Sequence, residues 1–174
     1  MQYGVGASPG AAVATRPKDP PAGVDFSGLD LRESSMAGAA LAGGKFRGTC
    51  LAGADLSGAD LEGAECVAVD LSGADLTGAV LRGANLLMAD LTGADLTGVD
   101  LTGADISGAD LTGAVMTGAV LSGTSFNLAT ELPDSYWDEH VPSPEGRRLA
   151  ETYIREGWVE SLGEMTALVR VLAG

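Results

Sequence analysis

Apolar residues recur at every fifth position over more than half of the chain. Between Phe26 and Phe126, all 21 positions in steps of five are apolar. The residue two places earlier is nearly always small, Asp stands one place earlier in 11 of the 21 repeats, and Gly stands two places later in 17 of them. A period of five fits neither the 3.6-residue turn of a helix nor the two-residue alternation of a strand. A turn must therefore interrupt the backbone in every repeat.

The Gly positions supply that turn. A type II β-turn needs a positive φ at its third residue, which Gly adopts without steric cost. Four such turns close a square, so four repeats make one coil with the central and small residues inside. The pattern predicts an all-β solenoid of about five coils, roughly 25 Å tall if the layers are about 4.8 Å apart.

The segments at 54–61 and 89–96 both have the form A-D-L-[ST]-G-A-D-L. They resemble the pentapeptide-repeat protein family over roughly residues 24–128. The resemblance implies a right-handed quadrilateral β-helix. The chain is accordingly divided into a flexible N-terminal tail at 1–23, a β-helix at 24–128 and a C-terminal cap at 129–174 that contains two short helices.

The first C-terminal helix is expected to begin at Ser143 and Pro144, because Ser is a favoured N-cap and Pro fits the first turn. It should end near Glu156, before Gly157. Its buried residues are expected to be Leu149, Tyr153 and Ile154. The aromatic pair Tyr136 and Trp137 is expected to cover the last Leu layer of the solenoid.

The second C-terminal helix follows a capping-box spacing from Ser161 to Glu164. Its apolar residues fall on one stripe, formed by Leu162, Met165, Val169 and Leu172. This stripe has two possible partners. It packs on the solenoid or on the first helix, or it pairs with a second copy in a homodimer, as C-terminal helices do in some members of the family.

Four repeats lack the Gly and have Glu33, Ala68, Met88 and Leu128 in its place. The last three are separated by whole coils and therefore share one wall. A changed turn type is expected at Ala68 and Met88. Val67, Leu87 and Met88 should then form an exposed apolar patch, which is a partner-binding surface, a harmless drift of the repeat, or a surface covered by the N-terminal tail.

Outward-facing Asp residues also fall into columns, with one position per coil. The candidate partner-binding set is Asp55, Asp60, Asp70, Asp75, Asp90, Asp95, Asp100 and Asp110. Two interpretations are open. The carboxylates accept hydrogen bonds from turn N–H groups, as in Asx turns, or they imitate the phosphates of DNA. Residues 24–128 carry 14 acidic and 4 basic residues, against about 15 charges on duplex DNA of roughly the same length.

Composition narrows the function classes. The chain of 174 residues has a net charge of −14 and a single His. Such acidity disfavours direct binding to nucleic acid or to anionic membranes. Neither a signal sequence nor a membrane span is evident, so a cytoplasmic location is expected. Since no catalytic, cofactor or metal-binding motif is recognisable, the expected protein is neither an enzyme nor a cofactor carrier.

Two functions remain. The first is an acidic DNA mimic that binds a type II topoisomerase such as gyrase and inhibits it or protects it from poisons. The resemblance implies this activity, because the best-understood members of the family act in this way. The alternative is a rigid scaffold or adaptor for a regulatory or signalling protein, without DNA mimicry.

Overall fold

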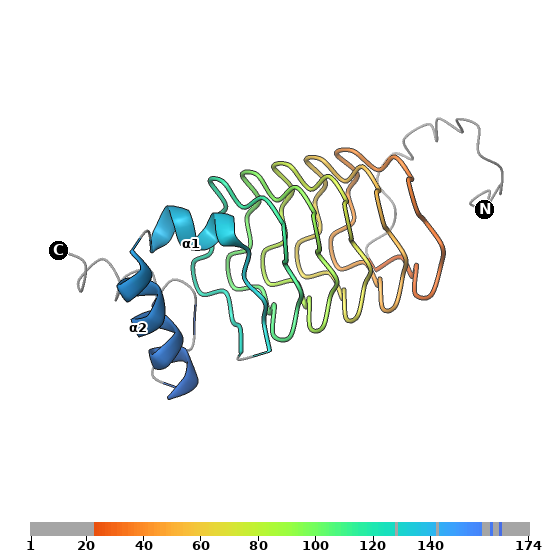
Figure 1. Cartoon of the computed structure of the whole chain (residues 1–174). Helices are drawn as coiled ribbons and strands as arrows, with labels where there is room; N and C mark the ends of the chain where they lie inside the picture. Colours follow the sequence, from red (N-terminus) through yellow and green to blue (C-terminus); the bar gives the residue numbers. More distant parts are fainter. Residues whose placement is uncertain (1–22, 128, 142, 158–160, 162–163, 165–174) are drawn as a thin grey trace.

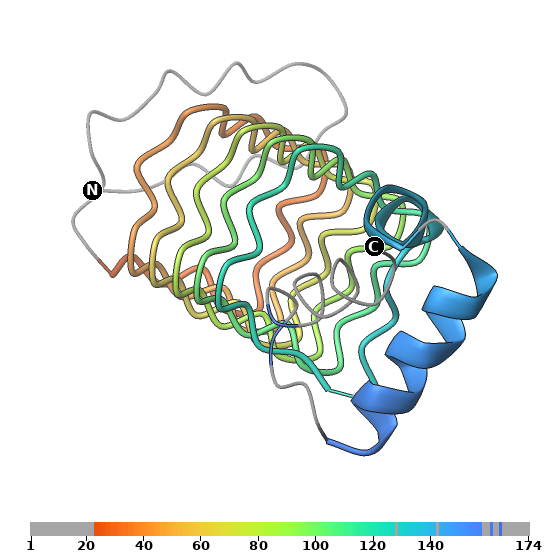
Figure 2. The same ribbon diagram turned by 90° about the vertical axis from the view of Figure 1, so that its left-hand side faces the viewer.

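The computed structural model describes residues 23–127, 129–141, 143–157, 161 and 164. The repeats form a rod of stacked coils, and two helices lie at its C-terminal end (Figure 1). Both helices lie opposite the end at which the chain enters the rod, as the perpendicular view confirms (Figure 2). Within the described residues, none of the helices has the length and apolar character needed to cross a membrane.

Parallel backbone pairing joins each repeat to the repeat that lies four further along the chain. Asp25 pairs with Lys45, Lys45 with Glu65, and so on through each side of the coil. The Phe26 N–H donates to the Lys45 carbonyl at 2.8 Å, and the Lys45 N–H donates back to the Val24 carbonyl at 2.9 Å. Each side of a coil contributes only one bridged residue, because a turn follows within the same repeat.

The turns have the predicted geometry. The Leu29 N–H closes the first one by donating to the Phe26 carbonyl at 3.1 Å, and Gly28 has a φ of 68°. This combination is the type II turn, whose third residue lies in the left-handed region. The same turn recurs in the repeats centred on residues 26 to 121, so four corners close each coil.

Leucine layers fill the interior of the rod. The central residues from Leu41 to Leu121 are buried, as are nearly all of the small residues beside them. Phe46 is fully buried and stacks on Phe26 with ring centroids 5.0 Å apart. Cys66 occupies one of these inward positions, and burial raises the pKa of its thiol to about 12. The core is therefore mainly aliphatic, as the pattern of the repeats predicts.

The expected change of turn type at Ala68 and Met88 is wrong. Both residues keep the left-handed conformation, with φ of 52° and 58°, and Glu33 does the same at 55°. The Ala68 N–H still donates to the Leu87 carbonyl at 2.9 Å, and the Met88 N–H to the Ser107 carbonyl at 3.0 Å. The inter-coil hydrogen bonds therefore impose a conformation that costs a non-Gly residue about 1–3 kcal/mol.

Parallel pairing continues past residue 128, where the sequence pattern ends. Glu131 pairs with Asp110, although the regular register would pair Asp110 with Thr130. The side chains of Asn127 and Thr130 accept from the Gly108 N–H at 3.1 Å each, in place of the usual backbone carbonyl. The extra residue is thus absorbed at one corner, and pairing resumes on the next side with Glu131, one residue later than the regular register.

Helix α1, Asp134–His140, was not predicted. It is only seven residues long and begins after Pro133 without a side-chain cap, so the sequence offers no periodicity to detect. Its Tyr136 and Trp137 are 0% and 7% exposed. They are buried at this end of the rod, as expected of the aromatic pair that follows the last coil.

Helix α2, Pro144–Arg155, confirms the predicted start, because the Ser143 hydroxyl accepts from the Gly146 N–H at 3.0 Å. Its expected buried residue Leu149 is instead 38% exposed, and the neighbouring Ala150 is buried. Tyr153 and Ile154 are half-buried. The prediction for Leu149 was wrong because the helix packs through a small residue, which allows a closer approach than a Leu would.

The segment after α2 returns to the rod at Ser161, which forms an antiparallel bridge with Ser125. The Glu164 N–H donates to the Ser161 hydroxyl at 3.3 Å, as the capping-box spacing predicts. The apolar stripe of Leu162, Met165, Val169 and Leu172 lies outside the described residues.

Replacing Ala68 with Gly should stabilise the rod. The substitution removes the left-handed strain of a non-Gly residue and leaves the inter-coil hydrogen bonds intact, so we expect the melting temperature to rise by about 2–4 °C. Gly73, with φ of 64° and open space around its Cα, is the matched control. Gly73→Ala should lower the melting temperature by a similar amount. A neutral or destabilising Ala68→Gly variant would show that Ala68 is not strained.

Candidate protein-binding surface

Every Asp of the repeats is fixed by its own turn. The Asp90 carboxylate accepts from the Thr92 N–H at 2.9 Å and from the Thr92 hydroxyl at 2.7 Å. The same bond to the N–H two residues later is present at Asp25, Asp30, Asp55, Asp60, Asp70, Asp75, Asp95, Asp100, Asp105 and Asp110. Asn85 accepts in the same way from Leu87. The Asx-turn interpretation is therefore confirmed for all of these side chains.

The register of four repeats per coil sorts these positions into four columns. The Asp70 column holds Asp30, Cys50, Asp70, Asp90, Asp110 and Glu131; the Asp95 column holds Ser35, Asp55, Asp75, Asp95 and Val115; the Asp100 column holds Ala40, Asp60, Val80, Asp100 and Val120; and the Asn85 column holds Asp25, Lys45, Glu65, Asn85, Asp105 and Ser125. Only the first two contain at least three acidic residues in succession. Like charges lie one layer apart there, at about 4.8 Å.

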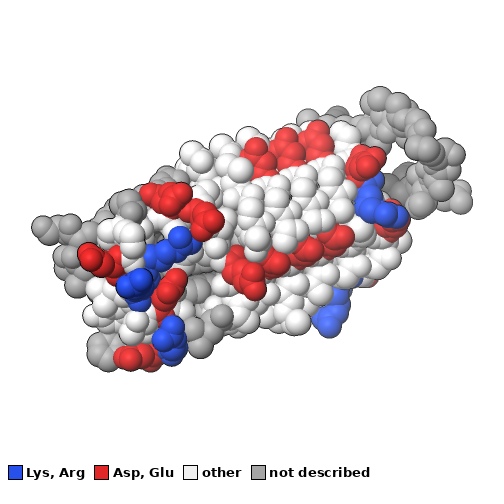
Figure 3. Space-filling view, in the orientation of Figure 1, with Lys and Arg blue, Asp and Glu red and all other residues white. Residues whose placement is uncertain are grey.

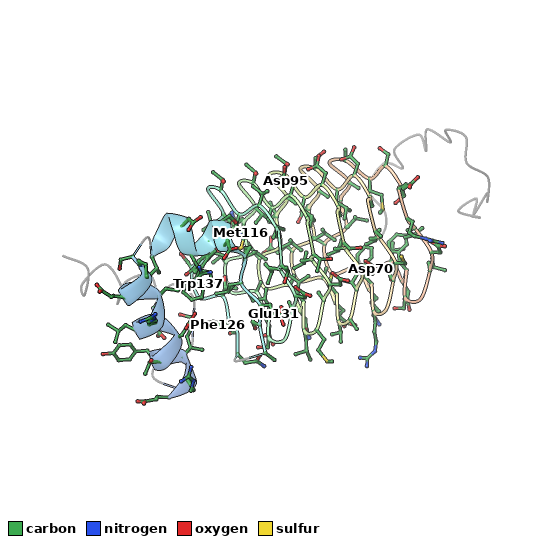
Figure 4. The ribbon with its side chains drawn as sticks, in the orientation of Figure 1. Asp70, Asp95, Met116, Phe126, Glu131 and Trp137 are labelled. Atoms are coloured by element: carbon green, nitrogen blue, oxygen red, sulfur yellow. The ribbon has the colours of Figure 1, made fainter. Side chains whose placement is uncertain are left out.

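These two columns border the same wall of the rod. We name this wall, residues 50–55, 70–75, 90–95 and 110–115, the acidic face. These residues include no Lys or Arg, and Arg32 lies on the first coil of the same wall, beyond them; small or apolar residues and hydroxyl groups fill the sequence between the columns. Figure 3 shows two parallel red stripes that border an uncharged strip. Figure 4 labels Asp95 on one column and Asp70 and Glu131 on the other.

Two of the predicted site residues lie on a different wall. Asp60 and Asp100 are separated in their column by Val80 and followed by Val120, which is 44% exposed. Asp100 is also paired with Arg82, whose Nε donates to its carboxylate at 2.6 Å. The structure thus brings six of the eight predicted Asp residues together on the acidic face and leaves these two apart from it.

Glu131 belongs to the end of the acidic face but was not among the predicted residues. It extends the Asp70 column by one layer, and its carboxylate accepts from the Thr112 hydroxyl at 3.2 Å. Counting one coil onward from Asp110 reaches Thr130 instead, because one residue is inserted at the corner near Asn127. The sequence indicated this position only by an acidic residue that stands one place after the expected position 130.

Turn hydrogen bonds keep several of these carboxylates ionised. The Ser72 hydroxyl is the main cause of the lowered pKa of Asp70, to which the Cys50 Sγ also donates at 3.2 Å. Hydrogen bonding from Thr97 and Thr112 lowers the pKa of Asp95 and Asp110. The turn uses Oδ1, and within the described residues the Oδ2 atoms of Asp95 and Asp110 accept no hydrogen bond. One oxygen of each of these two carboxylates is therefore open to a partner.

The apolar patch of Val67, Leu87 and Met88 is smaller than its sequence suggests. Val67 and Leu87 are both half-buried. Of the three side chains, only Met88 is strongly exposed, at 66%. The column one place after the centre also contains Arg47 and Ser107, so polar side chains border the patch above and below. The patch has one prominent side chain, whereas the acidic face has two continuous rows.

Within the described residues, His, Cys, Asp and Glu form no group of three or more that could hold a metal ion. The carboxylates of each column point outward on successive layers instead of converging on one point.

The five-residue repeat, its turn and the pairing of repeats four apart together define the class of solenoid to which the chain is compared. The pentapeptide-repeat family model, with eight copies, matches residues 22–58, 59–98 and 94–130. This chain belongs to the pentapeptide-repeat family. No curated protein sequence matches it.

Several solved pentapeptide-repeat structures are similar to the chain. A crystal structure of Rfr23, from the cyanobacterium Cyanothece 51142, is 29% identical, with a TM-score of 0.61 over 63% of this chain and 88% of that one. HetL of Nostoc sp. strain PCC 7120, described as involved in heterocyst differentiation regulation, is 30% identical, with a TM-score of 0.47 over 63% and 70% of the two chains. Rfr23 thus supports the assignment of the solenoid fold.

Asn and Ala substitutions should separate two roles of Asp90, as the hydrogen-bond acceptor of its turn and as a negative charge. Asn retains the oxygen that accepts from the turn N–H, as Asn85 shows, whereas Ala removes it. We expect Asp90→Ala to lower the melting temperature by about 2–4 °C and Asp90→Asn to change it by less than about 1 °C. Calorimetry on both variants checks this expectation. Equal losses would mean that charge, and not the turn bond, is the stabilising property.

Acid should weaken the fold. Arg32 lowers the pKa of Asp30 to about 2, and Thr102 followed by Arg82 lowers the pKa of Asp100 to about 2. Because these groups bind protons less readily when folded than the ordinary Asp carboxyl, whose pKa is about 3.9, they stabilise the fold above about pH 4, and this contribution is lost as the pH falls toward 2.

We therefore expect the melting temperature to fall steadily from pH 5 to pH 2, and to fall less steeply in the Asp100→Asn variant. A rod that melts higher at pH 2 than at pH 5 would show instead that repulsion between the columns dominates.

Proposed function

We propose that the acidic face binds a basic, DNA-binding surface of a partner protein, and that a type II topoisomerase such as gyrase is that partner. The observation that carries this proposal is the pair of parallel acidic columns, uninterrupted by Lys or Arg, on one wall. Binding there would inhibit the enzyme or protect it from poisons. The rod acts as a non-catalytic binding protein in this proposal, and the named partner implies a cytoplasmic location.

The charge density of the acidic face supports mimicry of DNA. Each column places one carboxylate per layer of about 4.8 Å, so two columns together give one charge per about 2.4 Å. Duplex DNA carries one charge per about 1.7 Å. The two rows border an uncharged strip, much as two phosphate backbones border a groove. A protein surface evolved for phosphates therefore meets a comparable number of charges in a similar arrangement.

Rigidity favours binding through these carboxylates. Each side chain is already held by its turn, as the 2.9 Å bond from the Thr97 N–H to Asp95 illustrates. A partner that pairs with the second oxygen does not have to immobilise a mobile side chain, which ordinarily costs about 0.5–1.5 kcal/mol for each side chain ordered at an interface. The turn that defines the fold thus also prepares the charge for binding.

Pairing of two copies would lengthen the surface. The apolar stripe at Leu162, Met165, Val169 and Leu172 is the proposed dimer contact, with packing on the rod as the other outcome. Sedimentation equilibrium distinguishes them, because the dimer has twice the mass of the monomer.

The decisive experiment is a gyrase supercoiling assay with the purified protein, with and without a quinolone. We expect inhibition or protection that weakens as salt rises, because charges dominate the contact. The triple variant Asp70→Asn, Asp90→Asn and Asp110→Asn should be about tenfold less potent, since each lost charge contributes about 0.5 kcal/mol and a tenfold change corresponds to about 1.4 kcal/mol. Its Asn side chains preserve the turns.

The matched control carries the same charge change elsewhere: Asp25→Asn, Asp60→Asn and Asp105→Asn. It should retain nearly full potency. Absence of any effect of the wild-type protein at micromolar concentration would eliminate gyrase as the partner. Equal losses in the two triple variants would show that total charge matters and the acidic face does not.

The second candidate function is that of an adaptor that binds a regulatory protein through the apolar patch. The observation that favours it is Met88, which is 66% exposed and held at a φ of 58°. Strained, exposed residues are more common at functional sites than elsewhere. An adaptor of this kind would lose its partner in a Met88→Glu variant and ignore the Asn substitutions on the acidic face.

A further inference from the structure

The N-terminal end of the rod presents an open backbone edge. In the second coil, the N–H groups of Lys45, Cys50, Asp55 and Asp60 donate to carbonyls of the first coil, each at 2.9 Å. The equivalent donors of the first coil are Asp25, Asp30, Ser35 and Ala40, and they have no acceptor within the described residues. An edge of this kind pairs with other chains unless it is covered or blunted.

The apolar layer at the same end is incompletely covered by the described residues. Phe26, Leu31 and Met36 are half-buried, although the equivalent residues of the next coil are 0–2% exposed. Leu29 is 39% exposed. The C-terminal end differs, because Tyr136 and Trp137 are buried there. Within the described residues, the apolar layer is therefore covered at the C-terminal end of the rod and only partly covered at the N-terminal end.

A buried hydroxyl group at this end lacks a partner among the described residues. The hydroxyl of Thr49 donates to the carbonyl of Phe26, 23 residues earlier, and that of Thr124 donates to Leu101, also 23 residues earlier. Ser34 occupies the same place in its own repeat, two residues before the central Met36, yet within the described residues its buried Oγ has no hydrogen-bond partner.

We propose that residues 1–22 of the same chain fold over this end and supply a backbone carbonyl that accepts from the Ser34 hydroxyl. The segment joins the rod at the open edge itself, through Gly23. Its stretch 1–15 contains no charged side chain and includes Tyr3, Val5 and Val13. A tethered segment of this composition reaches the exposed layer at a far higher effective concentration than a separate molecule. This cap is independent of the partner proposed above.

The cap ends the stack instead of extending it. In the register of the repeats, the central positions of one more coil would be Gly6, Ala11, Arg16 and Pro21, which cannot form another Leu layer. Pro17, Pro20 and Pro21 also lack the N–H that pairing requires. The segment thus covers the apolar layer and leaves no regular edge, so it prevents rods from pairing end to end. Its composition alone favours a flexible tail, whereas the unfinished edge gives it a binding site.

A coupling experiment on the full-length protein tests the cap. One variant carries Ser34→Ala, a second replaces residues 1–15 with Gly and Ser at the same length, and a third combines both changes. With the native segment, Ser34→Ala should lower the melting temperature by about 2–4 °C, because a hydrogen bond is lost. With the Gly-Ser segment, the same change should have less than half of that effect. The matched control is Ser35→Ala, whose side chain is exposed and which should be neutral in both backgrounds.

Hydrogen exchange and sedimentation provide the independent readouts. In the native protein, the backbone amides of residues 24–43 should exchange their hydrogens as slowly as those of residues 64–83. In the Gly-Ser variant, the amides of residues 24–43 should exchange at least tenfold faster. Sedimentation should also show that this variant associates as its concentration rises. Equal effects of Ser34→Ala in both backgrounds, or unchanged exchange in the Gly-Ser variant, would overturn the cap. A native dimer whose dissociation alone exposes residues 24–43 would also overturn it, because a second copy would then be the cover.

Discussion

The turn that recurs from repeat to repeat sets the register of the rod. It needs a left-handed residue at its third position, and the chain meets that need with Gly in 17 of 21 repeats. Once four corners close a coil, each residue lies beside its counterpart four repeats later. The inner columns become Leu layers, and the outer columns become rows of like side chains. The acidic face therefore follows from backbone geometry combined with the choice of residue at one position of the repeat.

The strength of this constraint is visible where the sequence departs from it. Ala68 and Met88 adopt the left-handed conformation despite their side chains. A different turn would have relieved about 1–3 kcal/mol of strain at each residue. It would also have left buried backbone groups without partners on both neighbouring coils, at about 1–3 kcal/mol for each group. The larger penalty prevails, so the coils remain in register through both departures.

Sequence periodicity predicted the features that recur in each repeat. It did not predict features that occur once in the chain and depend on local geometry or tertiary packing. The Leu core and the acidic columns follow from counting repeats. The short helix α1 is too short to show a period, and the inserted residue near Asn127 shifts Glu131 out of the count. Leu149 was misplaced because the angle at which α2 meets the rod is a tertiary property. The ion pair between Arg82 and Asp100 depends on the orientation of a long side chain, which no period encodes.

The inserted residue before Glu131 has a consequence for how the chain tolerates changes in length. An insertion of one whole repeat would preserve every turn and every Leu layer, yet it would rotate all downstream side chains by a quarter of the rod's circumference. The acidic rows would then be cut and redistributed over different walls in a protein that still folds. An insertion of four whole repeats would lengthen both rows by one layer. The addition of any whole number of repeats thus preserves the fold, but only the addition of complete coils also preserves the acidic rows on the surface.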